Sequence, residues 1–425
     1  MKPIHFIYLF IFLFAIVGYP AAYLFDREGM FYYFVRNVDS GYLGIAYFWT
    51  VVSFLLIALL NVVLGSHRRF DMFMRRKTED GWIKPDLLWI VVFTASVMMN
   101  LLFFVKMDFS LPLLNLPENV TELLLKRIDV KERLNPVLFS LSATVLGPLS
   151  LILALFFIRS RRKAKIALSV VNFLIIGTFS LAKSSFIIGV VIVIASYSFI
   201  RPLSYSKMIK LGVLFIALLL PMFFLTKSKE AGHVQGQAIA EIVTARIIYG
   251  QWAALPFFFE MFEKEPQTLK ILLPPYLGDG SAWERNGEEV APRKVMRAVT
   301  GYKVLEGTGA GVAVTYFIGE AYAVGGRLGV LFGCLLVSGQ IWMMTYVFSR
   351  LRKTPLAIYA YSWLIYKICM GLITGLSAFV VSSFSVALFV LFLYVLFVEV
   401  GREVILAQRQ LTARRRALAP AGEIG

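Results

Sequence analysis

The sequence predicts an all-α protein that crosses a membrane many times. Of its 425 residues, 59% are hydrophobic and 16% are charged, and the mean hydropathy is +0.74. A soluble domain is closer to half apolar and a quarter charged. Apolar runs long enough to cross a bilayer also recur along the chain. With only two cysteines, neither a disulfide framework nor a cysteine-rich metal site is available.

Ten apolar runs have the length of a membrane-spanning helix. They lie at about 4–24, 43–64, 87–105, 136–158, 166–182, 186–200, 211–226, 328–349, 355–377 and 379–399. The first has Lys2 ahead of it and Ala21 and Ala22 behind it, as a signal peptide would. We interpret it as a retained signal anchor, because nine further spans follow.

The positive charge indicates the orientation of these spans. If the N-terminus is cytoplasmic, the net charge of +17 falls almost entirely in the cytoplasmic segments, as the positive-inside rule requires. An even number of spans then makes the C-terminus cytoplasmic too. Nucleic-acid binding requires a basic face on a folded domain rather than short basic loops beside lipid, so the sequence argues against it.

The span layout divides the chain into four parts. Residues 1–226 carry the first seven helices with short loops, and residues 227–327 form one large periplasmic loop. Residues 328–400 carry the last three helices, and residues 401–425 form a basic cytoplasmic tail. No internal repeat of span groups is evident, although many secondary transporters have one.

The large loop is expected to open with an amphipathic helix at residues 236–262. Arg246 lies on its apolar stripe, in line with Ile242 and Tyr249, and no carboxylate lies three or four residues away to pair with it. Either Arg246 reaches the lipid–water boundary, or it binds an anionic ligand or a remote acid.

Further along the loop, turn signals at 278–289 surround Arg285, and a short helix is expected after Pro292. That helix carries Arg293, Lys294 and Arg297. Three cations within five residues either form a solvated surface or bind a phosphate group.

The segment GTGAGVAVTYFIGEAYAVGGRLGV, residues 307–330, returns the chain to the membrane. Glu320 and Arg327 lie seven residues apart and share a helical face if the helix continues through Gly325 and Gly326. A carboxylate at a membrane boundary is costly unless it is solvated or paired. The two residues therefore form an interfacial ion pair, or Glu320 has a functional role.

Two lysines lie in or beside apolar spans. Lys183 is at the outer tip between two short spans, either as a turn cation or as a fixed charge facing an outer cavity. Lys367 is near the centre of its own span with no acid in that span, so we expect it to face the interior of the bundle.

Several kinds of chemistry lack their motifs. No group of His, Cys and carboxylate has metal-ligand spacing, and no Walker, Rossmann or nucleophile-elbow motif occurs. No cofactor or metal is therefore predicted. The remaining candidates are outer-facing cations and Glu320, which suit a lipid-linked substrate whose phosphate groups the cations neutralise. The cations are Lys183, Arg246, Arg285, Arg293, Arg297 and Arg327.

Three passages resemble the bacterial O-antigen and capsule polymerases of the Wzy type, the oligosaccharide repeat-unit polymerases. They are SLAKSSFIIGVVIVI, AEIVTARIIYGQ and the return segment at residues 307–330. The resemblance implies a C-type glycosyltransferase bundle. It also implies that an undecaprenyl-pyrophosphate-linked glycan is transferred to a lipid-linked repeat unit, with inversion and without a metal. Membrane lipids, a chain-length regulator and a flippase are the implied partners, and the bacterial inner membrane is the implied location.

The resemblance also suggests roles for particular residues. Arg246 matches the family's arginine in the large outer loop, and Lys183 stands where relatives have an arginine, so its charge remains while the bidentate geometry is lost. Glu320 falls in the family's acidic return motif as a catalytic candidate, with a substrate-positioning role preferred. His233 is the sole outer histidine and the other candidate for proton transfer.

Three other functions remain open. An O-antigen ligase would use lipid A core as the acceptor, and a histidine deep in the large loop would be expected. A polyprenyl-monophosphate-sugar glycosyltransferase would need an acidic pair such as Asp26 and Glu28 in the first outer loop. A polysaccharide flippase or transporter would need many spans and buried cations, but no single large outer loop.

Overall fold

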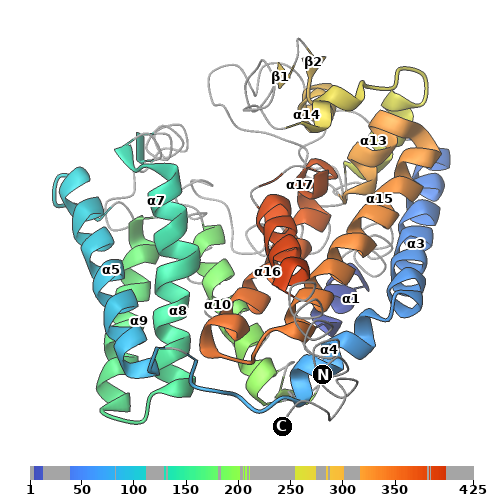
Figure 1. Ribbon diagram of the computed structural model, residues 1–425. Coiled ribbons are helices and arrows are strands. Elements are labelled where there is room, and N and C mark those ends of the chain that lie inside the picture. Colours follow the sequence, from blue (N-terminus) through green and yellow to red (C-terminus); the bar gives the residue numbers. More distant parts are fainter. Residues whose placement is uncertain are drawn as a thin grey trace, which may run out of the picture.

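The computed structural model shows a mostly helical membrane protein (Figure 1). It describes residues 4–12, 39–81, 83–111, 129–130, 133–179, 183–201, 204, 206–207, 210, 254–273, 284–285, 288–300, 316–380, 382 and 384–398. Within them, six helical stretches are long and apolar enough to cross a membrane. These are Gly41–Val63, Pro85–Lys106, Val137–Phe157, Ile318–Arg350, Pro355–Thr374 and Ser377–Val398.

One group of helices comes from the first half of the chain and lies together in Figure 1. It comprises α5 (Pro85–Lys106), α7 (Pro136–Leu141), η2 (Ser142–Leu146), α8 (Gly147–Ile152), η3 (Leu153–Phe157), α9 (Arg162–Phe179) and α10 (Lys183–Ile200). The stretch from α7 to η3 is one continuous helix with two π-helical segments, η2 and η3. In η2, the carbonyl of Thr144 accepts a hydrogen bond of 2.5 Å from the hydroxyl of Tyr359.

The second group combines the N-terminal helices with those of the C-terminal third. It comprises α1 (His5–Ile11), α3 (Ser40–Val63), α4 (Ser66–Arg75), α15 (Ile318–Arg350), α16 (Pro355–Thr374), α17 (Ser377–Val380) and the helix of residues 384–398. Above it lies a unit that we call the hairpin unit, made of α13 (Leu255–Phe262), η5 (Leu269–Leu272), β1 (Glu284–Arg285), β2 (Glu288–Glu289) and α14 (Ala291–Thr300). β1 and β2 pair antiparallel, so the expected all-α fold carries one small hairpin.

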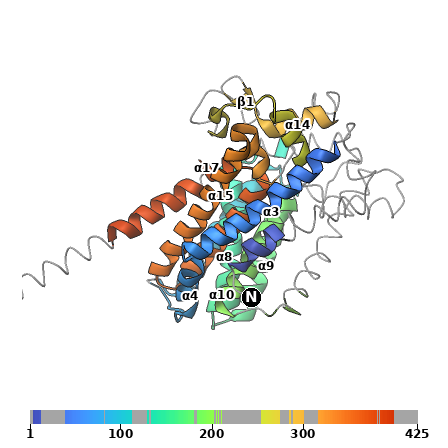
Figure 2. The same ribbon diagram turned by 90° about the vertical axis from the view of Figure 1, so that its right-hand side faces the viewer.

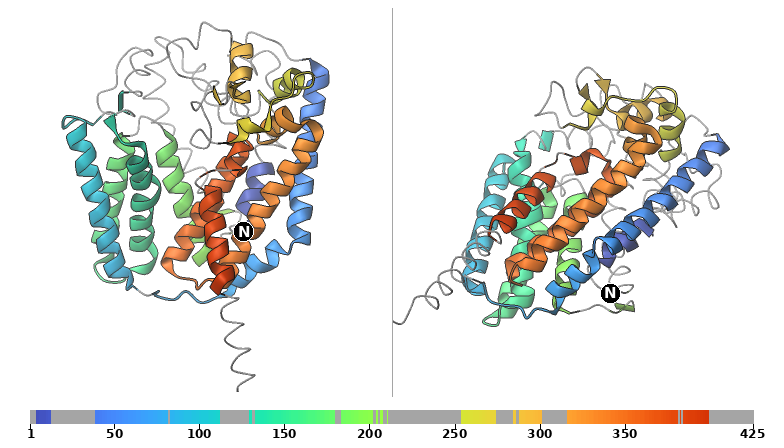
Figure 3. Two further views of the ribbon diagram at one scale, coloured as in Figure 1. Left: turned by 45° about the horizontal axis from the view of Figure 1, so that its top comes forward. Right: turned by 45° about the vertical axis from the view of Figure 1, so that its right-hand side comes forward.

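Helix α16 lies between the two groups and contributes to both of their cores (Figure 3, left). Tyr359 and Tyr366 pack into the core of the first group, whereas Tyr361 packs into that of the second. Tyr361 stacks on Phe348 of α15 with ring centroids 4.2 Å apart. Residues spaced along one helix thus join the two halves of the bundle.

A ladder of polar side chains joins α5 to α9 inside the first group. Asn172 donates from Nδ2 to Ser96 Oγ at 2.7 Å and accepts at Oδ1 from Asn100 Nδ2 at 2.6 Å. Nearer the other end, Trp89 Nε1 donates to Ser169 Oγ at 3.0 Å. Polar side chains that bond across apolar helices fix their register, because lipid offers them no alternative partner.

The two ends of the bundle differ in charge. We call the end formed by residues 64–84, 158–162 and 351–354 the basic end, and the opposite end, which carries the hairpin unit, the hairpin end (Figure 2). At the basic end, Lys353 Nζ donates to the carbonyl of Met74 at 2.9 Å, and Arg76 donates to the carbonyls of Leu351 and Ser349. Burial lowers the pKa of Lys353 below the ordinary lysine value.

Most of the expected spans coincide with observed helices. The six candidates match six predicted runs, and α9 and α10 cover the runs at 166–182 and 186–200. Most of the run at 4–24 and all of that at 211–226 lie outside the described residues, as do the loop at 25–38 and the tail beyond 398. α15 begins at Ile318, before the expected start at 328, because the return segment is already helical.

We expect Asn172→Leu to weaken the packing of α5 against α9, because Ser96 and Asn100 each lose a partner. The free energy of unfolding should fall by on the order of 1 kcal/mol. Two interhelical hydrogen bonds are lost, and each contributes well under that value on average. Unfolding in mixed micelles measures this change. Thr178→Val is the matched control on α9, because its exposed hydroxyl bonds only the carbonyl of Ile175. Equal stability of the two variants would contradict a role for the ladder.

Candidate functional site

The return segment folds back on itself at Gly325 and Gly326. Gly326 has φ +56° and ψ −142°, which are not helical values, and Gly325 is also non-helical. A Cβ on Gly329 would lie 2.1 Å from the carbonyl oxygen of Ala321, and one on Gly333 would lie 2.9 Å from the Phe317 ring. In each pair, one residue lies before the break and the other lies about as far after it. Residues 318–324 therefore run back along the helix that follows. The glycines permit this close approach.

This turn separates Glu320 from Arg327. Glu320 is 8% exposed, whereas Arg327 is exposed on the other side of the break. The condition for a shared helical face, an uninterrupted helix through Gly325 and Gly326, is not met.

The carboxylate of Glu320 binds the start of α17. Its Oε2 accepts a hydrogen bond of 2.8 Å from the backbone N–H of Ser377, and its Oε1 accepts one of 3.4 Å from the Ser377 hydroxyl. A carboxylate at the first residue of a helix satisfies an N–H group that has no partner within the helix. Glu320 therefore joins the return segment to the turn between the last two spans.

The same contact explains why a glycine stands at position 375, where α16 ends. It ends α16 with φ +132° and ψ 172°, a backbone region that is essentially restricted to glycine. A Cβ there would lie 2.4 Å from the carboxyl carbon of Glu320. A side chain at this position would strain the backbone and would clash with the Glu320 carboxylate.

The hairpin unit is fixed to the return segment by hydrogen bonds. The backbone N–H of Gln267 donates to the carbonyl of Ala323 at 2.7 Å, and its Nε2 donates to the carbonyl of Glu289 at 2.8 Å. The ring of Phe259 on α13 lies 4.3 Å from that of Tyr322, centroid to centroid. Gln267 thus connects β2 to the segment that carries Glu320.

The arginines expected on the loop helix are paired with one acid. Glu289 of β2 binds Arg293 Nε at 3.2 Å and Arg297 Nη1 at 2.8 Å. Lys294 lies 3.8 Å from a carboxylate oxygen of Glu265. The expected helix is confirmed as α14, which begins at Ala291. Two guanidinium groups share one carboxylate at a partly exposed surface, although the described residues of the hairpin unit carry equal numbers of cations and acids.

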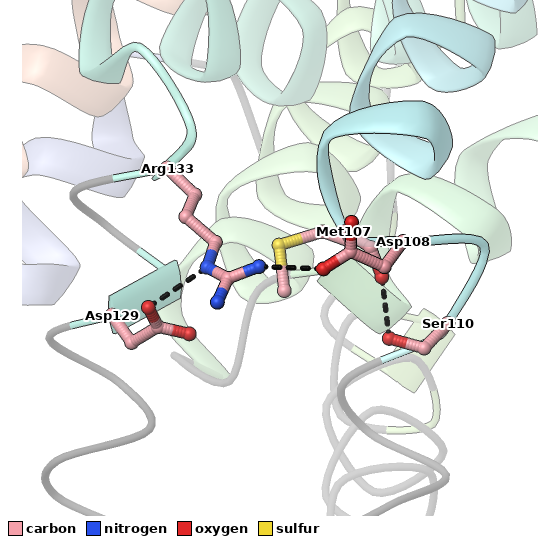
Figure 4. Close-up of polar contacts among 5 residues, drawn as sticks. All are labelled: Met107, Asp108, Ser110, Asp129 and Arg133. Carbon is pink, nitrogen blue, oxygen red and sulfur yellow. Dashed lines mark hydrogen bonds and ion pairs between the residues drawn. The ribbon is translucent and has the colours of Figure 1, made fainter.

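A separate polar cluster closes the hairpin end of α5 (Figure 4). Arg133 donates from Nη1 to Asp108 at 2.7 Å and from Nε to Asp129 at 2.8 Å. Asp108 and Phe109 both have positive φ, which ends the helix sharply. Two carboxylates around one arginine make this cluster negative, so it ties residues 129–133 to α5 and does not suit an anion.

The structure brings together only some of the residues that the sequence singled out. Glu320, Arg293 and Arg297 are carried by elements that contact one another, and Arg327 lies at the same end of the bundle. Arg246 and His233 lie outside the described residues. Lys183 begins α10 and Arg285 lies in β1, but their side chains are not among those described.

Lys367 is partly buried in the middle of α16. Its described contact is with the ring of Trp363, whose centre lies 5.2 Å from Nζ. Among the described residues, no group of three His, Cys, Asp or Glu side chains is arranged to hold a metal ion.

Sequence reasoning missed Glu289, Gly375 and Ser377. Gly375 follows the last apolar residues of a span, which is where a glycine commonly ends a helix, and Ser377 follows as a potential helix start. Nothing in the sequence, however, links these residues to Glu320, which lies more than fifty positions earlier.

Comparisons of this chain with known protein families, with curated proteins and with solved structures find no match.

We expect Gly375→Ala to lower the free energy of unfolding. Backbone strain alone usually costs about 1 to 3 kcal/mol, and the clash with Glu320 adds to that loss. Thermal unfolding in detergent measures the effect. Gly339→Ala is the control, since a Cβ on that helical glycine meets no atom within 4 Å.

The loss of unfolding free energy caused by Gly375→Ala should be smaller in a chain that also carries Glu320→Ala. The clash with the carboxylate is then absent, and only the backbone strain remains. Additive losses in the double variant would show that the two residues do not interact.

Proposed function

We propose that this protein is a membrane glycosyltransferase that polymerises undecaprenyl-pyrophosphate-linked repeat units into a surface polysaccharide. Transfer takes place at the hairpin end, which is the periplasmic face in the orientation that the basic end favours. An acceptor hydroxyl attacks the anomeric carbon of the donor, and the configuration inverts. Undecaprenyl pyrophosphate leaves, and the acceptor proton passes to a base.

The observation that carries the proposal is that a unit holding two arginines on one shared carboxylate is attached to the segment of a buried carboxylate at one end of the bundle. The return segment carries Glu320, and Gln267 links that segment to the strand whose Glu289 binds Arg293 and Arg297. A substrate whose lipid lies in the bilayer and whose phosphates lie at its surface meets both at this end. Resemblance to the repeat-unit polymerases supplies the reaction type.

The contacts of Glu320 favour positioning over proton transfer. Both of its oxygens accept hydrogen bonds from Ser377, and its side chain is 8% exposed. A general base must reach the proton that it abstracts. In the proposal, Glu320 holds the turn after α16 in place, and Arg246 and Lys183 neutralise the leaving pyrophosphate.

The function is tested by deleting the gene in its native host and reading the length distribution of the surface glycan on a gel. A polymerase predicts that long ladders collapse to one repeat unit and that single lipid-linked units accumulate. Loss of all translocated units would indicate a flippase instead. Long chains that remain on the carrier would indicate a ligase, and unchanged glycan would contradict the proposal for that polymer.

We expect Arg246→Ala to abolish polymer while the protein remains in the membrane at its normal level, because a leaving pyrophosphate loses a neutralising charge. The ladder in a complemented deletion strain and an immunoblot of the membrane fraction measure the two quantities. Lys264→Ala is the control, since it removes an exposed cation from the same outer segment. Normal ladders from Arg246→Ala would contradict the role given to Arg246.

A further inference from the structure

Two arginines at the basic end share one aromatic ring, that of Tyr346. The guanidinium carbon of Arg69 on α4 is 5.6 Å from the centre of the Trp342 ring and 5.8 Å from that of Tyr346. The guanidinium carbon of Arg350, at the end of α15, is 5.5 Å from the Tyr346 ring. These contacts bring two positive charges from different helices to one aromatic pair.

Arg69 is fixed in place by the fold of α4. Gly65 precedes the helix in a left-handed conformation, and Phe70 and Phe73 anchor it by complete burial. Arg69 itself donates from Nη1 to the carbonyl of Leu64. Among the described residues, no carboxylate forms an ion pair with Arg69, so its charge is not neutralised there.

The aromatic pair continues an apolar face of α15. Leu335, Gly339, Trp342 and Tyr346 recur at intervals of three or four residues and share one side of the helix. Leu335 is 55% exposed, and a Cβ on Gly339 would meet no atom of the described residues within 4 Å. This side of α15 therefore offers an open apolar strip that leads to the arginines.

A neighbouring helix adds apolar surface beside the strip. Phe392 of the helix 384–398 lies 5.8 Å from Trp342 and 5.6 Å from Tyr346, centroid to centroid. Exposed apolar side chains on a membrane-spanning helix face acyl chains, so this surface lies at the edge of the bilayer.

We propose that Arg69, Arg350, Trp342 and Tyr346 bind the phosphate group of an anionic phospholipid. A guanidinium that stacks on a ring still presents its N–H edge to an oxyanion. One acyl chain lies along Leu335 and over Gly339, where no side chain of the described residues occupies the strip. Basic sites between membrane helices bind acidic head groups in this way, and the site is separate from the one at the hairpin end.

Native mass spectrometry of the purified, delipidated protein tests this inference. The protein is titrated with phosphatidylglycerol and, separately, with phosphatidylcholine. We expect one phosphatidylglycerol to bind at least tenfold more tightly than phosphatidylcholine. Arg69→Gln combined with Arg350→Gln should remove that preference. Arg159→Gln combined with Lys163→Gln should retain it, because this pair removes the same charge from exposed positions elsewhere at the basic end.

A second variant tests the acyl-chain part of the site and serves if the arginine variant does not fold. Gly339→Leu fills the strip and leaves every charge unchanged, so it should weaken phosphatidylglycerol binding severalfold. Equal binding by the wild type and both variants would overturn the site. Loss of the preference in the control pair would show attraction to net charge alone. Displacement of the lipid by soluble glycerol phosphate would show a site for free phosphate.

Discussion

The arrangement of the hairpin end depends on one hydrogen-bonded carboxylate. Burying Glu320 is costly unless its charge is satisfied, and the N–H and hydroxyl groups of Ser377 help to satisfy it. That requirement fixes where the return segment ends, where α16 stops and where α17 begins. Because Gly375 must leave space for the carboxylate, two stretches of chain that are far apart in the sequence meet in one geometry. The hairpin unit then attaches to this junction through Gln267.

The bundle itself is joined by a different kind of contact. Tyr359 and Tyr366 of α16 pack with the first group of helices, and Tyr361 packs with the second. Because aromatic side chains bury large areas, these contacts of α16 help to unite the two cores. Helix α10 also contributes to both, with Ile192 in the first core and Phe199 in the second. Any substrate site near α16 is therefore built from both halves of the sequence.

Hydrophobicity and charge predict the elements of this fold but not how they meet. The apolar runs locate α3, α5 and α16 to within a few residues, because length and apolar composition are local properties. The helix at Ala291–Thr300 follows from Pro292 in the same way. The turn at Gly325 and Gly326 reverses the chain where the sequence allows either a helix or a break.

The candidate site is less predictable for the same reason. Glu320 stands out in the sequence as a carboxylate in an apolar run, but its partner Ser377 is an ordinary serine after a glycine. Glu289 appears among several acids, and only the pairing of β1 with β2 places it beside Arg293 and Arg297. Tertiary contacts between distant residues decide these roles, and a single sequence does not reveal such contacts.

The folded-back return segment imposes an order on the assembly of the protein during synthesis. Residues 318–324 leave the ribosome before α16 and α17, which supply Gly375 and Ser377. Until those last helices are made, Glu320 lacks the donors at Ser377. Domains generally assemble in the order of synthesis, but this junction closes only when the C-terminal helices insert, so the end of the chain completes a structure begun more than fifty residues earlier.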